Sequence, residues 1–195
     1  LHDIGRFEQI KRFHSFEPGT MDHAMYGADL LFGPEQMIRR FVKDPSFDQL
    51  ICVAIAKHSD FKLEGIEDER TLLHARLIRD ADKLDNCRVK LEESMETLLD
   101  MDEKTVGASP ISPKVWESCK AEESVLSADR KTGMDYWMSY LALYFDINFP
   151  ETYQIIKEQD YIRRIAERVP YSREDTKEKV AYTVKKLEEK MNIQP

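Results

Sequence analysis

Apolar residues recur along almost the entire chain at spacings of three and four, which is the period of an α-helix. No segment with the period-two alternation of a β-strand extends beyond a few residues. The breaks between apolar segments hold Pro, Gly and Ser, which are typical of loops. The pattern predicts helices over residues 1–13, 21–32, 34–42, 47–58, 68–101, 114–127, 134–145, 150–168 and 173–191. We therefore expect an all-α fold.

The spacing also predicts which face each helix buries. In the first helix the inward positions are Ile4, Phe7 and Ile10, and in the last they are Val180, Val184, Leu187 and Met191. The helix over residues 68–101 should bury a wide apolar face made of Leu72, Leu73, Leu77, Ile78, Ala81 and Leu84. The second helix should begin at a capping side chain, either Thr20 or Asp22.

Residues 101–113 interrupt the helical pattern with Gly107, Pro110 and Pro113. We therefore expect a helical core over residues 1–100 and a helical extension packed on it over residues 101–195. Because the chain opens at Leu1 directly on a motif, we expect this core to continue upstream of the given sequence.

Composition and charge exclude several classes of partner and site. The net charge is −8, and an acidic surface repels polyanions, so we expect no binding to nucleic-acid polymers. No apolar segment is long enough to cross a bilayer, so we expect no membrane partner. The cysteines Cys52, Cys87 and Cys119 form no CxxC pair, which argues against a disulfide framework or a cysteine zinc site. A reducing cytoplasm fits this cysteine usage best.

The first segment with candidate functional residues is Leu1-His2-Asp3-Ile4-Gly5-Arg6. Adjacent helical side chains diverge by about 100°, so His2 and Asp3 can grip one ion that lies between them. Imidazole and carboxylate both bind divalent metals. Gly5 would allow another helix to approach closely. A His-Asp dipeptide is also compatible with an ordinary helix start.

A second charged segment, Arg79-Asp80-Ala81-Asp82-Lys83-Leu84-Asp85, interrupts an otherwise apolar helix. Burial of such charges is costly unless they are paired or bind a metal. The alternative interpretation is a solvated stripe with local ion pairs. Two single histidines complete the set, His23 in DHAMYGADLL and His58 in AIAKHS. A lone histidine on an apolar helix is more often a packed or capping residue than a ligand.

In their order and spacing, HDIGR, DHAMYGADLL, AIAKHS and RLIRDADKLD resemble the HD-domain superfamily of metal-dependent phosphohydrolases, over about residues 1 to 90. The resemblance implies an HD-domain-like helical bundle with a C-terminal helical extension. It matches His2 and Asp3 to the conserved pair of that family and Asp82 to its last metal ligand. It also makes His23 and His58 additional ligands or proton donors.

The same resemblance suggests candidate substrate contacts at Lys83, Arg6 and Asp80. Surface ion pairing explains the two basic residues, Lys83 and Arg6, equally well. The family also has a ligand histidine on a helix before the His-Asp pair, which we expect upstream of Leu1. The loop after His58 lacks Gly-Tyr-Pro, which disfavours the HD-GYP branch.

The implied chemistry is hydrolysis of a small phosphate ester, such as a nucleotide, with one or two divalent ions drawn from Mn, Fe, Ni, Co, Zn or Mg. Asp3, His58 and His23 would be the catalytic side chains, with Asp3 bridging two ions or orienting a water. Two alternatives stay open, a degenerate HD domain that binds or signals and a di-iron oxygenase on the same scaffold. The sequence also leaves a homodimer open.

One aromatic group has two interpretations. Tyr136, Trp137, Tyr140, Tyr144 and Phe145 could line a pocket and stack on a base, but aromatic helix positions more often pack elements together. We therefore expect this group to serve packing.

Overall fold

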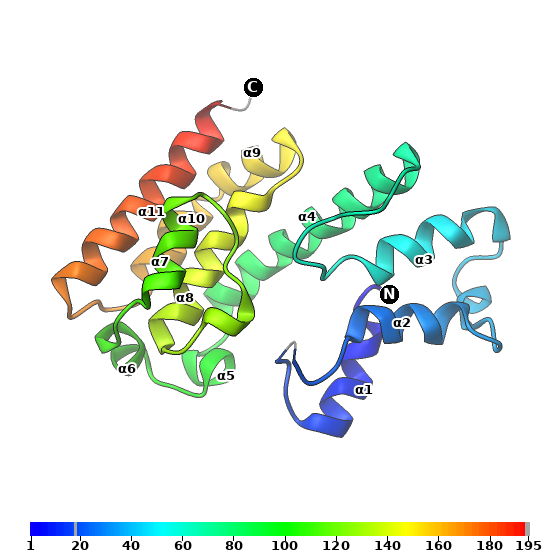
Figure 1. The fold of residues 1–195 in the computed structure, drawn as a ribbon, viewed down its shortest axis with the longest axis horizontal. Helices are drawn as coiled ribbons and strands as arrows, with labels where there is room; N and C mark the ends of the chain where they lie inside the picture. The colour runs from blue at the N-terminus through cyan, green and yellow to red at the C-terminus, as the bar shows by residue number, and fades with distance from the viewer. Residues whose placement is uncertain (18, 194–195) are drawn as a thin grey trace. The chain divides into compact units, whose positions relative to one another are not determined.

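The computed structural model describes residues 1–17 and 19–193 and confirms the all-α prediction, with no strand in these residues (Figure 1). The chain divides into two compact units, Leu1–Arg79 and Asp80–Pro195. The sequence prediction placed a boundary near residue 100, whereas the observed division falls within the helix α4 (Glu69–Glu92). Among the described helices, none is both long and apolar enough to cross a membrane.

The first unit contains three helices before α4. They are α1 (Ile4–Phe13), α2 (His23–Phe32) and α3 (Asp48–Ala56), with two short 3₁₀ helices between the last two, η1 (Met37–Arg40) and η2 (Pro45–Phe47). Helix α2 packs against both α1 and α3. Its predicted cap is confirmed at Asp22, whose carboxylate accepts a hydrogen bond of 2.9 Å from the amide of Met25. The small core of this unit consists of Ala28, Leu31, Ile38 and Ile55.

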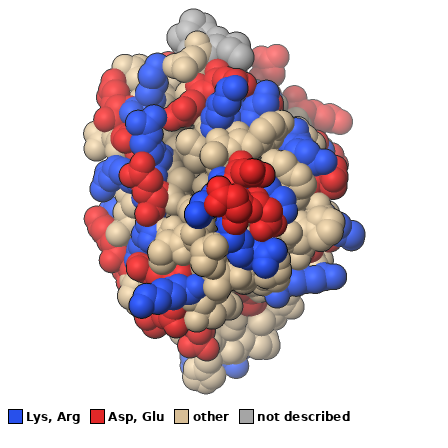
Figure 2. Space-filling view, turned by 90° about the vertical axis from the view of Figure 1, so that its left-hand side faces the viewer, with Lys and Arg blue, Asp and Glu red and all other residues tan. Residues whose placement is uncertain are grey.

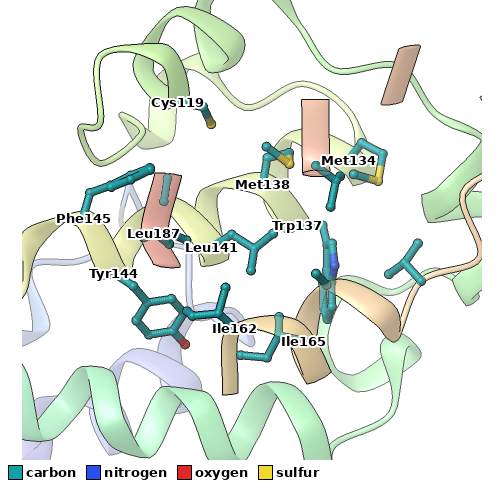
Figure 3. Packing of buried hydrophobic residues seen from close by; sticks show 14 of the residues in the cluster. Cys119, Met134, Trp137, Met138, Leu141, Tyr144, Phe145, Ile162, Ile165 and Leu187 are labelled. Carbon is teal, nitrogen blue, oxygen red and sulfur yellow. The ribbon is translucent and has the colours of Figure 1, made fainter. Parts of the chain in front are cut away.

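The central helix of the second unit is α8 (Gly133–Ala142), which packs against four other α-helices (Figure 1). These are α6 (Glu103–Ala108), α7 (Pro113–Lys120), α10 (Tyr161–Glu167) and α11 (Glu174–Ile193). The remaining elements are α5 (Met95–Leu99), η3 (Ser127–Asp129), η4 (Leu143–Asp146) and α9 (Pro150–Glu158). Trp137, Met138 and Leu141 of α8 are completely buried in the core (Figure 3).

The aromatic group divides between two roles. Trp137, Tyr144 and Phe145 are buried in the core of the second unit, which confirms the packing interpretation for these three residues. Tyr136 and Tyr140 are only half-buried on the same helix. The inward positions predicted for the last helix are also confirmed, since Val180, Leu187 and Met191 are buried and Val184 is half-buried against them.

Several predicted helices are shorter or divided. The helix over residues 68–101 ends at Glu92, and Ser94 then caps α5 by accepting from the amide of Thr97 at 3.1 Å. The predicted break at 101–113 contains α6, which Asp102 caps in the same way. The helix over 150–168 is divided into α9 and α10 at Asp160, which has a left-handed φ of 51°. Local side-chain caps, which compete with a continuing helix, explain the first two differences.

The residues over 34–42 form a single 3₁₀ turn, η1, instead of the predicted α-helix. The burial predicted for α1 was also partly wrong, because Phe7 is 81% exposed. The buried positions of α1 are Gly5 and Gln9. The side-chain amide of Gln9 donates two hydrogen bonds, one of 2.9 Å to the hydroxyl of Thr20 and one of 3.1 Å to the carbonyl of Glu17.

The buried stripe of α4 is polar, where a wide apolar face was predicted. Leu73 and Leu77 are 50% and 53% exposed. The buried positions are instead Thr71, Ala75, Arg79, Asp80, Lys83, Cys87 and Lys90. Its charged members are therefore buried, and what pairs with them decides whether they are structural or functional.

The surface carries both signs of charge close together. On the face seen in Figure 2, basic and acidic side chains are interspersed without a large area of one sign. On α11 this arrangement consists of pairs one turn apart, such as Lys177 with Glu174 at 3.1 Å and Lys179 with Asp175 at 3.2 Å. The three cysteines are free thiols.

Candidate metal centre

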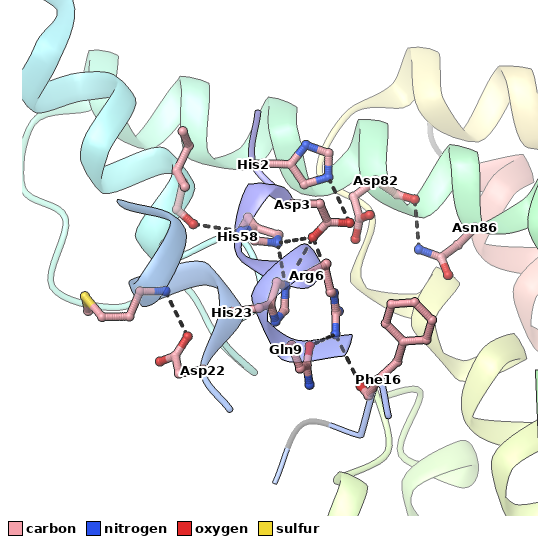
Figure 4. Close-up of polar contacts among 12 residues, drawn as sticks. His2, Asp3, Arg6, Gln9, Phe16, Asp22, His23, His58, Asp82 and Asn86 are labelled. Atoms are coloured by element: carbon pink, nitrogen blue, oxygen red, sulfur yellow. Dashed lines mark hydrogen bonds and ion pairs between the residues drawn. The ribbon is translucent and has the colours of Figure 1, made fainter. Parts of the chain in front are cut away.

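Four of the predicted site residues meet in the first unit (Figure 4). His2 and Asp3 precede α1, His23 is the first residue of α2, and His58 lies in the turn that follows α3. The Asp22 cap fixes the start of α2, and so it also fixes His23. Three segments that are distant in sequence therefore deliver their polar side chains to one place.

Three of these side chains form a tight triangle of potential ligand atoms. Oδ1 of Asp3 lies 3.2 Å from Nε2 of His23 and 3.4 Å from Nε2 of His58. The two Nε2 atoms are 3.1 Å apart. Two ligand atoms that are each about 2.1 Å from one ion lie about 3.0 to 3.4 Å from each other in octahedral or tetrahedral coordination. The triangle therefore has the dimensions of three ligands to one ion.

The protonation of His58 suits a ligand. Its Nδ1 lies 2.7 Å from the carbonyl oxygen of Ile55, which can only accept a hydrogen bond, so Nδ1 carries the proton. In the neutral ring, Nε2 then has a lone pair directed toward Asp3 and His23. A histidine that ligates a metal commonly donates its other ring nitrogen to a carbonyl in this manner.

The carboxylate of Asp3 is incompletely satisfied. Its Oδ1 is buried and accepts no hydrogen bond from the described residues, although two imidazole nitrogens lie close to it. Burial raises the pKa of Asp3, but the side-chain contact with His23 and the nearby charges of Arg6 and His2 lower it. The resulting pKa lies well below the usual range, so Asp3 is ionised. A buried, ionised oxygen of this kind fits a bound cation.

His2 lies on the other side of the Asp3 carboxylate. Its Nε2 is 3.7 Å from Oδ2 of Asp3, and its ring meets that of His58 edge-on with centroids 5.0 Å apart. In the described part of the chain, His2, Asp3 and His58 offer ligand atoms that all lie within 4.8 Å of one another. The donor set of two or three imidazoles and one carboxylate is suited to a divalent metal.

Two arginines support this cluster. Nε of Arg6 lies 3.5 Å from Oδ1 of Asp3, while its Nη1 donates to the side chain of Gln9 and the carbonyl of Phe16. Arg79, which is buried, donates to the carbonyls of His58, at 3.2 Å, and Asp60, and so fixes the turn that carries His58. Sequence reasoning missed this role of Arg79, because its acceptors are backbone groups that no sequence motif reveals.

The remaining predicted residues lie in the second unit. Asp80, which is 1% exposed, accepts hydrogen bonds from the amide and side chain of Asn148 and from the amide of Phe149. Nζ of Lys83 donates to the carbonyl of Asp146 and lies 2.7 Å from its carboxylate. Both side chains therefore fasten the segment before α9 to α4, which is a structural role. Asp82 is half-buried on α4, and its role as a ligand stays a prediction.

Comparison with known proteins adds no assignment. No protein-family model matches the chain, and no curated protein and no solved structure matches it significantly.

Proposed function

We propose that this protein is a metal-dependent phosphohydrolase that cleaves a small phosphate ester. The observation that carries the proposal is the convergence of Oδ1 of Asp3 with Nε2 of His23 and Nε2 of His58. These three side chains, with His2, would hold the metal within the first unit. The resemblance of this ordered set to the HD domain supplies the reaction class.

A bound divalent ion would lower the pKa of a coordinated water and offset the negative charge of the phosphate. The chain itself contributes orientation and charge. Asp3 is ionised and so is ready to bind a cation without first losing a proton. The hydrogen bond from Nδ1 of His58 to Ile55 favours a ligand role for His58 over proton donation. Arg6, beside Asp3, offers a positive charge to a bound phosphate.

Replacement of Asp3 by Asn tests the proposal. The parent should retain a divalent metal in elemental analysis and release phosphate from at least one member of a nucleotide and sugar-phosphate panel. Asp3→Asn should lose the metal and reduce phosphate release by about a hundredfold or more, because the anionic ligand is gone. Asp29→Asn is the matched control, since Asp29 is an exposed aspartate on α2.

Two outcomes would reject the proposal. If Asp3→Asn holds metal as well as the parent and Asp29→Asn, the metal centre is wrong. If the parent holds metal but releases phosphate from no ester, the hydrolytic reaction is wrong, and a binding domain or an oxygenase becomes the better interpretation.

Arg79 provides a second test, because its hydrogen bonds to the carbonyls of His58 and Asp60 position the turn that carries His58. Arg79→Lys removes the planar group that donates to two carbonyls in the turn, so we expect the metal affinity to fall about ten- to a hundredfold. Arg76→Lys, at an exposed position on the same helix, should leave it unchanged. Titration with Mn²⁺ in competition with a chelating dye measures both. Equal affinities in the two variants would show that the turn does not depend on Arg79.

A further inference from the structure

Two positive charges of the second unit lie over tyrosine rings of α8. Tyr136 and Tyr140 are four residues apart on α8 and therefore share one face of that helix. Each ring is covered by a cation: the guanidinium carbon of Arg130 lies 4.5 Å from the centroid of Tyr136, and Nζ of Lys90 lies 3.9 Å from that of Tyr140. We call these four residues the cation–tyrosine face.

Lys90 is the unusual member of this face. Its residue is 8% exposed, and its ammonium group has neither a hydrogen-bond acceptor nor an ion pair among the described residues. The residue is nevertheless not completely enclosed, because a small part of it remains exposed. A cation–π contact replaces only part of the lost hydration of an ammonium ion. A largely desolvated cation without an acceptor is suited to an anionic ligand.

Arg130 places a second positive charge over the ring of Tyr136, one helical turn before Tyr140. Burial is the main cause that lowers the pKa of Lys90, the charge of Asp82 raises it, and the charge of Arg130 lowers it. Arg130 is held in place by its stacking on Tyr136 and by a bond of 3.4 Å from its Nε to the carbonyl of Ser127. Two positioned cations suit an anion with several oxygens, because each can donate a charge-assisted hydrogen bond to a different oxygen.

We propose that Lys90 and Arg130, held against Tyr140 and Tyr136, bind an oxyanion of the phosphate type. The site consists of residues of the second unit alone and does not depend on the metal chemistry proposed for the first. Lys90 supplies the desolvated charge, Arg130 the planar donor group, and the two rings hold both cations in position.

Inorganic phosphate is the probe. The full chain is titrated with phosphate by calorimetry in the presence of EDTA, which keeps divalent metals away from Asp3 and the histidines. The parent should bind phosphate, and Lys90→Met should weaken the binding about ten- to a hundredfold, since a charged hydrogen bond is lost. Arg130→Met should weaken it similarly. The control is Lys185→Met, which removes a lysine whose side chain is 73% exposed on α11.

The proposal fails if the parent does not bind phosphate, or if Lys90→Met binds it as tightly as Lys185→Met does. Phosphate binding in EDTA without any hydrolase activity would leave this site standing and reject the proposed function. Hydrolase activity without phosphate binding in EDTA would do the reverse.

The burial of Lys90 also predicts a pH dependence of stability. Burial lowers the pKa of Lys90 to about 8, with Asp82 opposing and Arg130 assisting the change. The facing groups are thus Asp82 on α4, Arg130 before α8 and Tyr140 on α8. Between this value and the pKa of about 10.4 of a free lysine, the unfolded chain holds more protons, so stability should rise with pH.

We therefore expect the stability of the parent, measured relative to Lys90→Met, to increase from pH 8 to about pH 10 in urea unfolding. The comparison cancels the effect of the buried tyrosines and cysteines, which ionise at high pH in both proteins. At pH 7 the variant should be at least as stable as the parent, because it buries no charge. If the variant is much less stable at pH 7 and still binds phosphate normally, Lys90 serves packing alone and the proposal is overturned.

Discussion

Gly5→Ala is expected to destabilise the first unit by about 3 kcal/mol or more, the largest effect that a single methyl group should have in this chain. A Cβ atom on Gly5 would lie 2.1 Å from the carbonyl oxygen of His23 and 3.1 Å from the amide nitrogen of Gly27. Both contacts are with the backbone of α2, which cannot rotate away as a side chain can. Helices α1 and α2 would have to separate.

The same change should weaken metal binding, because the displaced carbonyl belongs to His23 itself. Urea unfolding and Mn²⁺ titration of the variant measure the two effects together. Gly19→Ala is the matched control, since a Cβ there would meet no atom within 4 Å. Equal stability of the two variants would contradict the close approach of α1 and α2. The sequence predicted this contact from the glycine in HDIGR, and the structure confirms it.

Asp80→Ala is expected to lower the free energy of unfolding by about 3 kcal/mol, because several donors lose their shared acceptor. The carboxylate of Asp80 is the acceptor for the amides of Asn148 and Phe149 and for the side chain of Asn148. Its removal leaves these half-buried donors without this acceptor and loosens the start of α9, whose first residue is Pro150.

Asp85→Ala is the control for this experiment. Asp85 lies on the same helix but is 62% exposed and pairs only with Arg88, at 3.0 Å, so its removal should change stability little. Urea unfolding of both variants tests the expectation. Comparable stability losses would mean that Asp80 does not anchor this segment. If Asp80→Ala were stable but inactive, Asp80 would instead contact substrate, as the resemblance implied.

The helical period and the local caps were the features best read from the sequence. Periodic apolar residues predicted α2, α3 and the inward face of α11, and Asp22 was a predicted cap. The convergence of Asp3, His23 and His58 followed from an ordered set of motifs rather than from any one of them.

The polar stripe of α4 could not be predicted in the same way. Apolar periodicity favoured burial of Leu73 and Leu77. It carries no information on the hydrogen-bond partners that Arg79 and Asp80 have elsewhere in the chain. Those partners are largely backbone carbonyls and amides, which every residue possesses. A pattern of side chains therefore does not predict these partners, and only the folded structure shows which loop each charged side chain is hydrogen-bonded to.

The adjacent residues Arg79 and Asp80 have a consequence for recombining this sequence with another. The acceptors of Arg79 precede it in the chain, at His58 and Asp60, whereas the donors to Asp80 follow it, at Asn148 and Phe149. A crossover at the bond between them keeps Arg79 with the carbonyls of His58 and Asp60 and keeps Asp80 with the donors of Asn148 and Phe149. A crossover between 61 and 79 would take these two carbonyls and Arg79 from different parents, and a crossover between 81 and 147 would do the same for Asp80 and its donors.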